Sequence, residues 1–377
     1  MDKYLYWLDN IAPLTARSKI CLLEAFQSGE EIYGAKEKHL RCILEEKKLE
    51  AIVNSKKYWD TDREYEKLLE QNIKMVACSD PDYPEKLRHI PGMPFGLYYK
   101  GQLPEEQLPS VAVIGARECS EYGRYVAAQL GKCLGENKIN VISGMAAGID
   151  GISQTAALEM GGFSYGVLGC GVDVCYPKSN KRLYEKLEKQ GGVISEYPPG
   201  TQPLKQYFPP RNRIVSGLAD VLVVIEARQK SGTSITVEMA LEQGKDIFAV
   251  PGRVTDRLSD GCNKMLQEGA HVFLSPQEFV LQLQQLLPDK MQALQRYKPN
   301  TARDTENAPK TAQEGIYGAL LQVLDFYPQH VEMLSERLLK ECRQEITIGE
   351  LNSLLIRMCI AGLAKQEGAG WFSKCGS

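Results

Sequence analysis

The segment Val111-Ala-Val-Ile-Gly-Ala-Arg117 contains four consecutive apolar residues that end at a glycine turn. Such a short apolar run is typical of a strand buried on both faces, as in parallel sheets. Similar runs recur further along the chain and alternate with segments of helical periodicity. We therefore predict an α/β core with a Rossmann-like, doubly wound, mostly parallel sheet. Further strands are expected at Asn140–Ser143, Tyr165–Leu168, Val193–Ser195, Val221–Ile225, Ile247–Val250 and His271–Leu274, and helices at Glu121–Leu134, Gly148–Met160, Ile235–Glu242 and Pro276–Leu287.

Other regions flank this core, which we place at residues 71–287. Residues 1–70 have helical periodicity and predict a small helical domain, either a module that binds DNA or a partner or a packing module. Within the core range, residues 73–101 are turn-rich and should add an edge strand or a lid. Residues 288–313 are rich in Lys, Arg, Asn, Thr and Pro and predict a flexible linker. Residues 314–377 predict three helices and a terminal hairpin, as in a winged helix. These helices are expected at Ile316–Leu324, Val331–Leu339 and Ile348–Cys359.

The composition limits the classes of function. The 377 residues are 43% hydrophobic and 25% charged with a net charge of -3, so a nucleic-acid surface must be a local patch. The eleven cysteines form no Cys-x-x-Cys pair and no export signal is evident, so we expect reduced thiols in a cytoplasmic protein. No run of about 18 apolar residues occurs, so no membrane span is expected. The four histidines lie far apart, and we expect neither a metal site nor another cofactor.

Small or polar residues follow several of the predicted strands. Gly115-Ala-Arg117 ends the first strand, and its arginine could pair with a phosphate. Ser143-Gly144 begins the loop after the second strand, and Ser231-Gly232-Thr233 begins a later helix. Both loops would let backbone amides approach an anion. Lys178 follows the third strand and could add positive charge. The alternatives are a structural surface arginine and close helix–strand packing, which also requires glycine.

The segment Lys205-Gln-Tyr-Phe208-Pro-Pro-Arg211-Asn212-Arg213 contains the densest group of binding residues. Because Phe208 precedes two prolines, we expect it to be extended, with its ring projecting to stack on a base. Stacking one base contributes ~1–3 kcal/mol and does not depend on base identity. Lys205 supplies a point charge, whereas the two arginines supply planar forks for phosphate. The alternative is a buried phenylalanine with arginines in salt bridges at a helix start.

Taken in order, these blocks resemble the DprA/Smf family, the DNA-processing protein A of bacteria. The resemblance spans about residues 80–275. It implies sequence-independent binding of single-stranded DNA, protection of incoming DNA, loading of the RecA recombinase during natural transformation, and homodimers. The family's groove would place Arg117, Lys205, Phe208, Arg211 and Asn212 against the strand. The motifs are Gly115-Ala-Arg117, Ser143-Gly-Met-Ala-Ala-Gly-Ile-Asp150, Tyr176-Pro-Lys-Ser-Asn180, Ser195-Glu-Tyr-Pro-Pro-Gly200, Phe208-Pro-Pro-Arg-Asn-Arg213, Ser231-Gly-Thr233, Ala240-Leu-Glu-Gln-Gly244 and Pro251-Gly252.

Some positions depart from the family's pattern. Ala116 stands where the family usually has serine, which removes one hydroxyl contact, and Gln154 stands where many members have histidine. The resemblance implies a SAM or helix-hairpin-helix-like domain at residues 1–70, but these residues lack a clear helix-hairpin-helix glycine signature, which argues against direct DNA binding by that domain. The complete set of candidate single-stranded-DNA-binding residues is Gly115, Arg117, Ser143, Gly144, Lys178, Lys205, Phe208, Arg211, Asn212, Arg213, Ser231, Gly232 and Thr233.

Two other functions compete with DNA binding. Phosphoribohydrolases of related fold release a base from a nucleoside monophosphate and carry a Pro-Gly-Gly-x-Gly-Thr-x-x-Glu loop. Here Glu238 follows Thr233 at the wrong offset and no double glycine precedes it, so we assign no catalytic residue and expect no enzymatic activity. The third hypothesis is an interaction scaffold whose winged unit contacts a partner. That unit lacks a dense basic recognition helix, which favours protein contact or packing over duplex readout.

Overall fold

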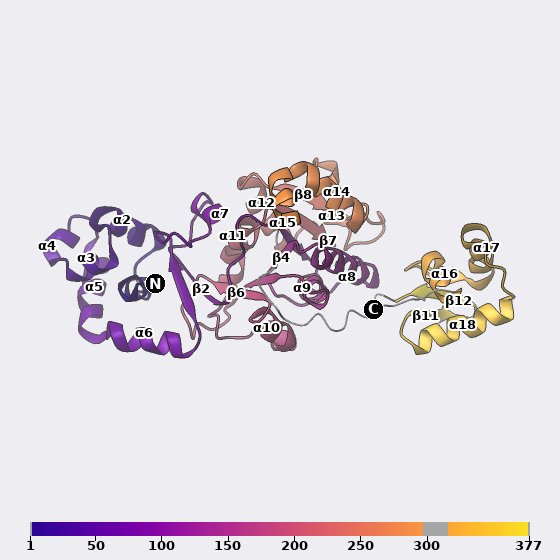
Figure 1. Cartoon of the computed structure of the whole chain (residues 1–377), viewed down its shortest axis with the longest axis horizontal. Coiled ribbons are helices and arrows are strands. Elements are labelled where there is room, and N and C mark those ends of the chain that lie inside the picture. Colours follow the sequence, from indigo (N-terminus) through magenta and orange to yellow (C-terminus); the bar gives the residue numbers. More distant parts are fainter. Residues whose placement is uncertain (1, 297–315, 376–377) are drawn as a thin grey trace.

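The computed structural model describes residues 2–296 and 316–375, with a helical N-terminal part, an α/β core and a smaller C-terminal part (Figure 1). The core contains one nine-stranded sheet of order β1-β2-β6-β5-β4-β3-β7-β8-β9. All neighbours from β6 to β9 pair in parallel, and β1 and β2 form an antiparallel edge. The predicted α/β class with a mostly parallel sheet is therefore confirmed. The strands are β1 Lys74–Ala77, β2 Gly96–Gly101, β3 Ser110–Gly115, β4 Asn140–Ser143, β5 Ser164–Val167, β6 Gly191–Ser195, β7 Val221–Ile225, β8 Asp246–Ala249 and β9 His271–Val272.

Helices cover both faces of this sheet. Alternate residues of a strand point to opposite faces, and in β3 Val111 and Val113 belong to one buried cluster while Ala112 and Ile114 belong to the other. Helices α8 and α14 pack in the first cluster, and α11 and α12 pack in the second. The core helices are α7 Glu85–Arg88, α8 Glu121–Glu136, α9 Ile149–Glu159, α10 Lys181–Leu187, α11 Phe208–Leu218, α12 Gly232–Glu242, α13 Asp260–Gln267, α14 Pro276–Leu286 and α15 Pro288–Arg296.

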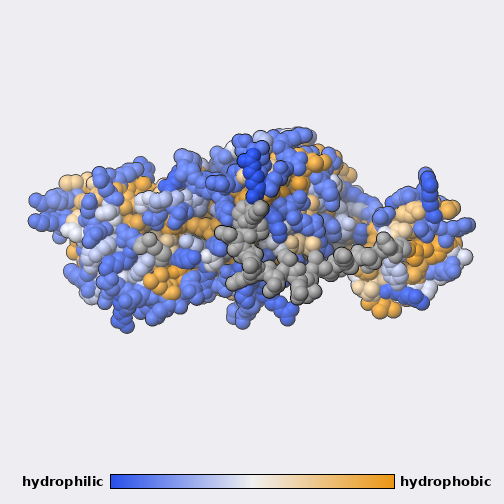
Figure 2. All heavy atoms as spheres, in the orientation of Figure 1, coloured by the Kyte–Doolittle hydropathy of each residue, from blue (hydrophilic) through white to orange (hydrophobic). Residues whose placement is uncertain are grey.

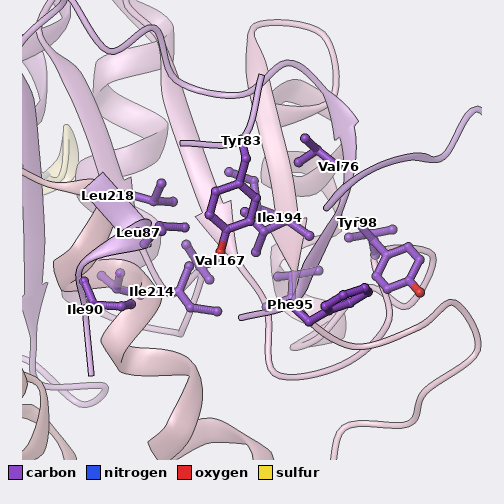
Figure 3. Packing of buried hydrophobic residues seen from close by; sticks show 14 of the residues in the cluster. Val76, Tyr83, Leu87, Ile90, Phe95, Tyr98, Val167, Ile194, Ile214 and Leu218 are labelled. Atoms are coloured by element: carbon purple, nitrogen blue, oxygen red, sulfur yellow. The ribbon is translucent and has the colours of Figure 1, made fainter. Parts of the chain in front are cut away.

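The segment between β1 and β2 holds α11 against the sheet. Figure 3 shows Tyr83, Leu87 and Ile90 of this segment packed with Ile214 and Leu218 of α11. The buried Tyr83 hydroxyl donates to the carbonyl oxygen of Pro94 at 2.7 Å, which satisfies its only polar group. Helix α11 is thus fixed from outside as well as by the sheet, and its first turn carries the densest predicted motif.

Six helices precede the sheet and pack on its antiparallel edge. The link is polar as well as apolar, because buried Asp9 pairs with Lys19 at 2.7 Å and accepts a 2.7 Å hydrogen bond from Tyr98 of β2. The apolar residues of these helices belong to the same cluster as those of α11. The helices are α1 Lys3–Asp9, α2 Ala16–Phe26, α3 Gly29–Gly34, α4 Glu37–Leu40, α5 Glu46–Tyr58 and α6 Thr61–Glu70.

The first nine residues of the predicted linker form a helix. Residues 288–296 form α15, where Met291 is buried and Lys290 pairs with Asp220 at 2.7 Å. The prediction was wrong for these nine residues, because the apolar side chains of Met291 and Leu294 and one ion pair anchor a segment of polar composition. Residues 297–313 of the predicted linker lie outside the described residues.

The C-terminal part has a separate core of three helices and a small sheet. The sheet has the order β10-β12-β11. Leu320, Leu334 and Leu355, one from each helix, are fully buried in the core of this part. Sequence analysis did not predict β10. The part contacts the α/β core through Tyr327, whose hydroxyl donates to Asp256 at 2.5 Å, and through Lys374, which lies over the Tyr125 ring. The elements are α16 Ile316–Val323, β10 Gln329–His330, α17 Val331–Cys342, α18 Ile348–Ile360, β11 Ala364–Gly368 and β12 Trp371–Lys374.

Hydrophilic side chains cover most of the face seen in Figure 2, with hydrophobic patches on the N-terminal helices and the C-terminal part. Two of the exposed apolar residues, Ile356 and Ile360, lie one turn apart on α18 and are 48% and 83% exposed. Among the described residues, no helix has the length and apolar character needed to cross a membrane.

Candidate functional site

A cavity of about 510 Å³ opens beyond the carboxyl end of β3. Strand β3 lies between β4 and β7, where the strand order changes direction, and open α/β sheets bind ligands at such a switch point. The cavity collects residues from the loops after β3, β4 and β7 and from the first turn of α11. Ten of the thirteen predicted site residues line it, namely Gly115, Arg117, Gly144, Lys205, Phe208, Arg211, Asn212, Ser231, Gly232 and Thr233.

The backbone of the loops after β3 and β4 is in direct contact behind this cavity. The amide of Ile149 donates to the carbonyl of Ala116 at 3.2 Å. Gly148 has a φ of 77°, and a Cβ there would lie 2.3 Å from the Ala116 oxygen. A Cβ on Gly115 would lie 1.9 Å from the carbonyl oxygen of Ile225. Gly148 is therefore required for close packing of the two loops, the alternative that the sequence left open for its motif, and Gly115 is required for the close approach of β3 and β7.

Asn180 also holds the loop after β4 in place. Its side-chain amide donates to the carbonyls of Met145 and Ala146 at 3.0 and 3.1 Å. Asn180 ends the short 3-10 helix η1, Lys178–Asn180, in which Lys178 is exposed and does not line the cavity. The Tyr176-Pro-Lys-Ser-Asn180 motif thus shapes the site through its tyrosine and its asparagine, while its lysine is exposed outside the cavity lining.

Two aromatic rings form one side of the cavity. Phe208 and Tyr176 have ring centroids 5.4 Å apart at an interplanar angle of 37°, and Tyr176 is 42% exposed. The Arg117 guanidinium lies over the Phe208 ring at 6.0 Å from its centroid. A partly exposed aromatic pair beside a cation can accept a flat π system such as a nucleobase. Tyr176 was not among the predicted site residues, although it lies in one of the quoted motifs.

The expected extended conformation of Phe208 is wrong. Its φ and ψ are -73° and -44°, so it is helical and is the first residue of α11. A residue before proline is usually kept out of this conformation, but here Pro209 and Pro210 occupy the first turn, where the missing amide hydrogens have no helical partner to lose. The start of α11, rather than an extended loop, positions the ring.

Arg211 is buried and serves as a brace. It is 4% exposed, and its Nη1 donates to the carbonyls of Gly144, at 2.9 Å, and Val167. Burial lowers the pKa of Arg211 to about 10, opposed by the nearby Asp150 carboxylate. Burial in turn raises the pKa of Asp150, opposed by Arg211 and by the amide of Gly144, which donates to it at 3.1 Å. The guanidinium therefore ties α11 to β5 and to the loop after β4.

Three predicted site residues lie outside the cavity lining. Arg213 forms a bidentate ion pair with Glu196, at 2.8 and 2.5 Å, and its Nε donates to Gly92 at 2.8 Å. The alternative of an arginine in a salt bridge at a helix start therefore describes Arg213. Ser143 is fully buried and donates to the carbonyl of Val113 at 2.6 Å, which joins β4 to β3. Lys178, described above, is the third.

The uncommitted positive charge at the cavity comes from Arg117 and Lys205. Both side chains are exposed, and neither forms an ion pair with any residue that the structure describes. Helix α12 begins at the same cavity without a side-chain cap, and the buried hydroxyl of its N-cap residue Ser231 has no hydrogen-bond partner within the described chain. Unpaired cations, a free helix N-terminus and aromatic rings are a donor set for a phosphate-bearing ligand with a flat base.

Comparison with known proteins connects this site to a family. Residues 74–284, more than half of the chain, match the model of the family described as DNA recombination-mediator protein A. The chain belongs to this family. The family resemblance predicted from the motifs is therefore confirmed.

The sequence similarity to curated members of the family extends over much longer segments than the motifs. The DNA processing protein DprA of Streptococcus pneumoniae is 44% identical over 214 residues, which cover 57% of this chain and 76% of that protein. The protein Smf of Synechocystis is 31% identical over 342 residues and 85% of each chain.

Two solved family structures superpose on this one. The X-ray structure of DNA processing protein A from Streptococcus pneumoniae has a TM-score of 0.67 at 37% identity and covers 74% of this chain and 98% of its own. A structure of the Helicobacter pylori protein, which concerns its single-stranded DNA binding mode, has a TM-score of 0.51 at 28% identity and covers 57% of this chain and 98% of its own.

Proposed function

We propose that the cavity at the end of β3 binds single-stranded DNA without sequence preference. The observation that carries this proposal is the Phe208–Tyr176 ring pair with the two uncommitted cations Arg117 and Lys205 at the same opening. A base stacked on Phe208 contributes ~1–3 kcal/mol whatever its identity, and the cations neutralise the backbone on either side. The binding mode of the Helicobacter pylori relative supports the same ligand.

We further propose that this DNA binding serves a role as a recombination mediator. Membership of the family supports a protein that protects incoming single strands and loads RecA on them during transformation, acting as a homodimer in the cytoplasm. We further propose that the C-terminal part is a winged helix. Its α18 exposes Ile356 and Ile360 rather than a row of cations, which favours contact with a protein over readout of duplex DNA.

The geometry gives less support to hydrolysis of a nucleotide. Glu238, the one glutamate considered for that reaction, is exposed on α12 and does not line the cavity. Asp150 does line it, but its carboxylate accepts from the Gly144 amide and faces Arg211, so it serves the loop structure. We therefore propose a binding protein rather than an enzyme.

Fluorescence anisotropy of a labelled oligo-dT tests the proposal. We expect salt-sensitive binding of the single strand that exceeds binding of a duplex of the same length. A positive result leads to a RecA strand-exchange assay on DNA coated with a single-strand-binding protein, with and without this protein. No binding of oligo-dT at low salt would reject the proposal, and release of free base from AMP would then favour the hydrolase.

A further inference from the structure

A second, smaller hollow of about 230 Å³ lies against the first. The two hollows share four lining residues, Ala116, Arg117, Ser231 and Thr233. The second hollow extends away from Phe208 toward the loop after β7, and its further lining comprises Glu118, Ala227, Arg228 and Leu258. Because they share a wall, a ligand too long for the first hollow has a continuous route into the second.

The shared wall has the donors that an anion requires. The Ser231 hydroxyl is buried and has no hydrogen-bond partner in the described part of the chain. Ser231 is also the N-cap of α12, an eleven-residue helix whose first amides receive no side-chain cap. A phosphate at this wall would accept from the hydroxyl and from those amides and would face the positive end of the helix dipole.

The second hollow has its own cation. Arg228 is exposed and forms no ion pair with a described residue. The loop that carries Leu258 also exposes Arg253 and Arg257, of which Arg253 lies over the Tyr327 ring. Glu118 also lines the hollow, while Asp256 accepts the hydroxyl of Tyr327. The ionisable side chains of the lining are therefore two arginines, Arg117 and Arg228, and one glutamate.

We infer that the second hollow is a subsite for the nucleotide next to the one stacked on Phe208. The phosphodiester between the two nucleotides lies at the Ser231 wall, Arg117 stands between the subsites, and Arg228 neutralises the following phosphate. The side chain of Leu258 offers an apolar surface to the second sugar or base. This inference rests on the proposed function and adds the direction in which the strand leaves the cavity.

Two variants give the two subsites different signatures in the anisotropy measurement with dT20. Arg228→Gln removes one phosphate contact, so the slope of log K against log salt should fall in magnitude by about 0.7 and the affinity by roughly fourfold at 0.15 M salt. Phe208→Leu removes stacking but no charge, so it should lower affinity with an unchanged slope. Lys230→Gln is the matched control, since Lys230 is exposed two residues from Arg228 but lines neither hollow.

The outcomes separate this inference from the function on which it rests. A wild-type slope for Arg228→Gln, or an equal fall for Lys230→Gln, would overturn the subsite while oligo-dT binding by the wild type still supports the proposed function. Failure of the wild type to bind oligo-dT would instead remove the proposed function itself. Ser231→Ala provides a second check, because it leaves the net charge unchanged and should weaken dT20 binding without altering the slope.

Discussion

The loop after β3 and the first turn of α11 both bring arginines to the same edge of the sheet, but they use them differently. Arg117 of the loop is exposed and unpaired among the described residues, whereas Arg211 is 4% exposed and bound to two carbonyls. Arg213, also on α11, is held by Glu196. The comparison shows that α11 lines the cavity with the Phe208 ring, while its two arginines form contacts within the protein. The loop after β3, in contrast, leaves the charge of Arg117 unpaired at the cavity.

The largest expected effect is on stability at the buried arginine. Arg211→Ala removes the brace between α11, β5 and the loop after β4 and leaves the Asp150 carboxylate buried beside an empty space. We expect the free energy of unfolding to fall by about 3–5 kcal/mol, because two buried carbonyls lose their donor and the buried carboxylate loses a nearby cation. Urea denaturation followed by circular dichroism measures this. Arg117→Ala is the control and should stay within about 0.5 kcal/mol of the wild type, and equal losses would erase the contrast between the two regions.

The next effect concerns the ring that α11 contributes. Phe208→Leu keeps an apolar side chain at the helix start but removes the stacking surface, so affinity for oligo-dT should fall by roughly 5- to 150-fold, equivalent to ~1–3 kcal/mol. Anisotropy measures the affinity, and Phe208→Tyr should retain most of it. If leucine binds as well as tyrosine, the aromatic pair with Tyr176 is not the stacking platform.

The salt dependence of oligo-dT affinity should distinguish the unpaired cations, Arg117 and Lys205, from Arg213, which is held in an ion pair. Arg117→Gln and Lys205→Gln should each reduce the magnitude of the salt slope by about 0.7, because each removes one phosphate contact. Arg213→Gln should leave the slope unchanged, since its guanidinium is occupied by Glu196 and the Gly92 carbonyl. A reduced slope in the folded Arg213→Gln protein would show that this pair opens to receive the strand.

The smallest expected effect is on the pH dependence of stability. Burial raises the pKa of Asp150 in the folded state, so the folded protein binds its proton more tightly than the unfolded chain does. Its contribution to stability is therefore full below the unfolded pKa of about 3.9 and is lost as the pH rises through the folded value. Denaturation of the wild type and Asp150→Asn at several acidic pH values measures the difference. A difference that is constant with pH would contradict the raised pKa.

The periodic parts of the fold could be predicted from the sequence. Short apolar runs located the central strands, and β4 and β7 have the predicted bounds. Glycine motifs located the edge of the sheet at which the cavity opens, because carboxyl ends of parallel strands share one edge.

What sequence analysis missed depends on contacts between distant residues. Arg211 and Arg213 are the same residue type, and the sequence does not show that the carbonyls of Gly144 and Val167 hold one of them and Glu196 the other. The helical conformation of Phe208 is set by the packing of α11 on the segment of Tyr83 and Leu87, against the local preference imposed by proline. In α15, an ion pair with Asp220 and the burial of Met291 outweigh a composition typical of linkers.

The backbone contact between Gly148 and Ala116 has a consequence for the thermodynamics of binding. The loop that carries Arg117 and the loop that begins α9 are held together, because the Ile149 amide and the Ala116 carbonyl join them without space for a side chain. This part of the cavity wall is therefore formed by contacts within the protein and does not require a ligand. A strand that binds there loses its own freedom but does not have to order the protein, so its affinity is less diminished by conformational entropy than it would be on a mobile loop.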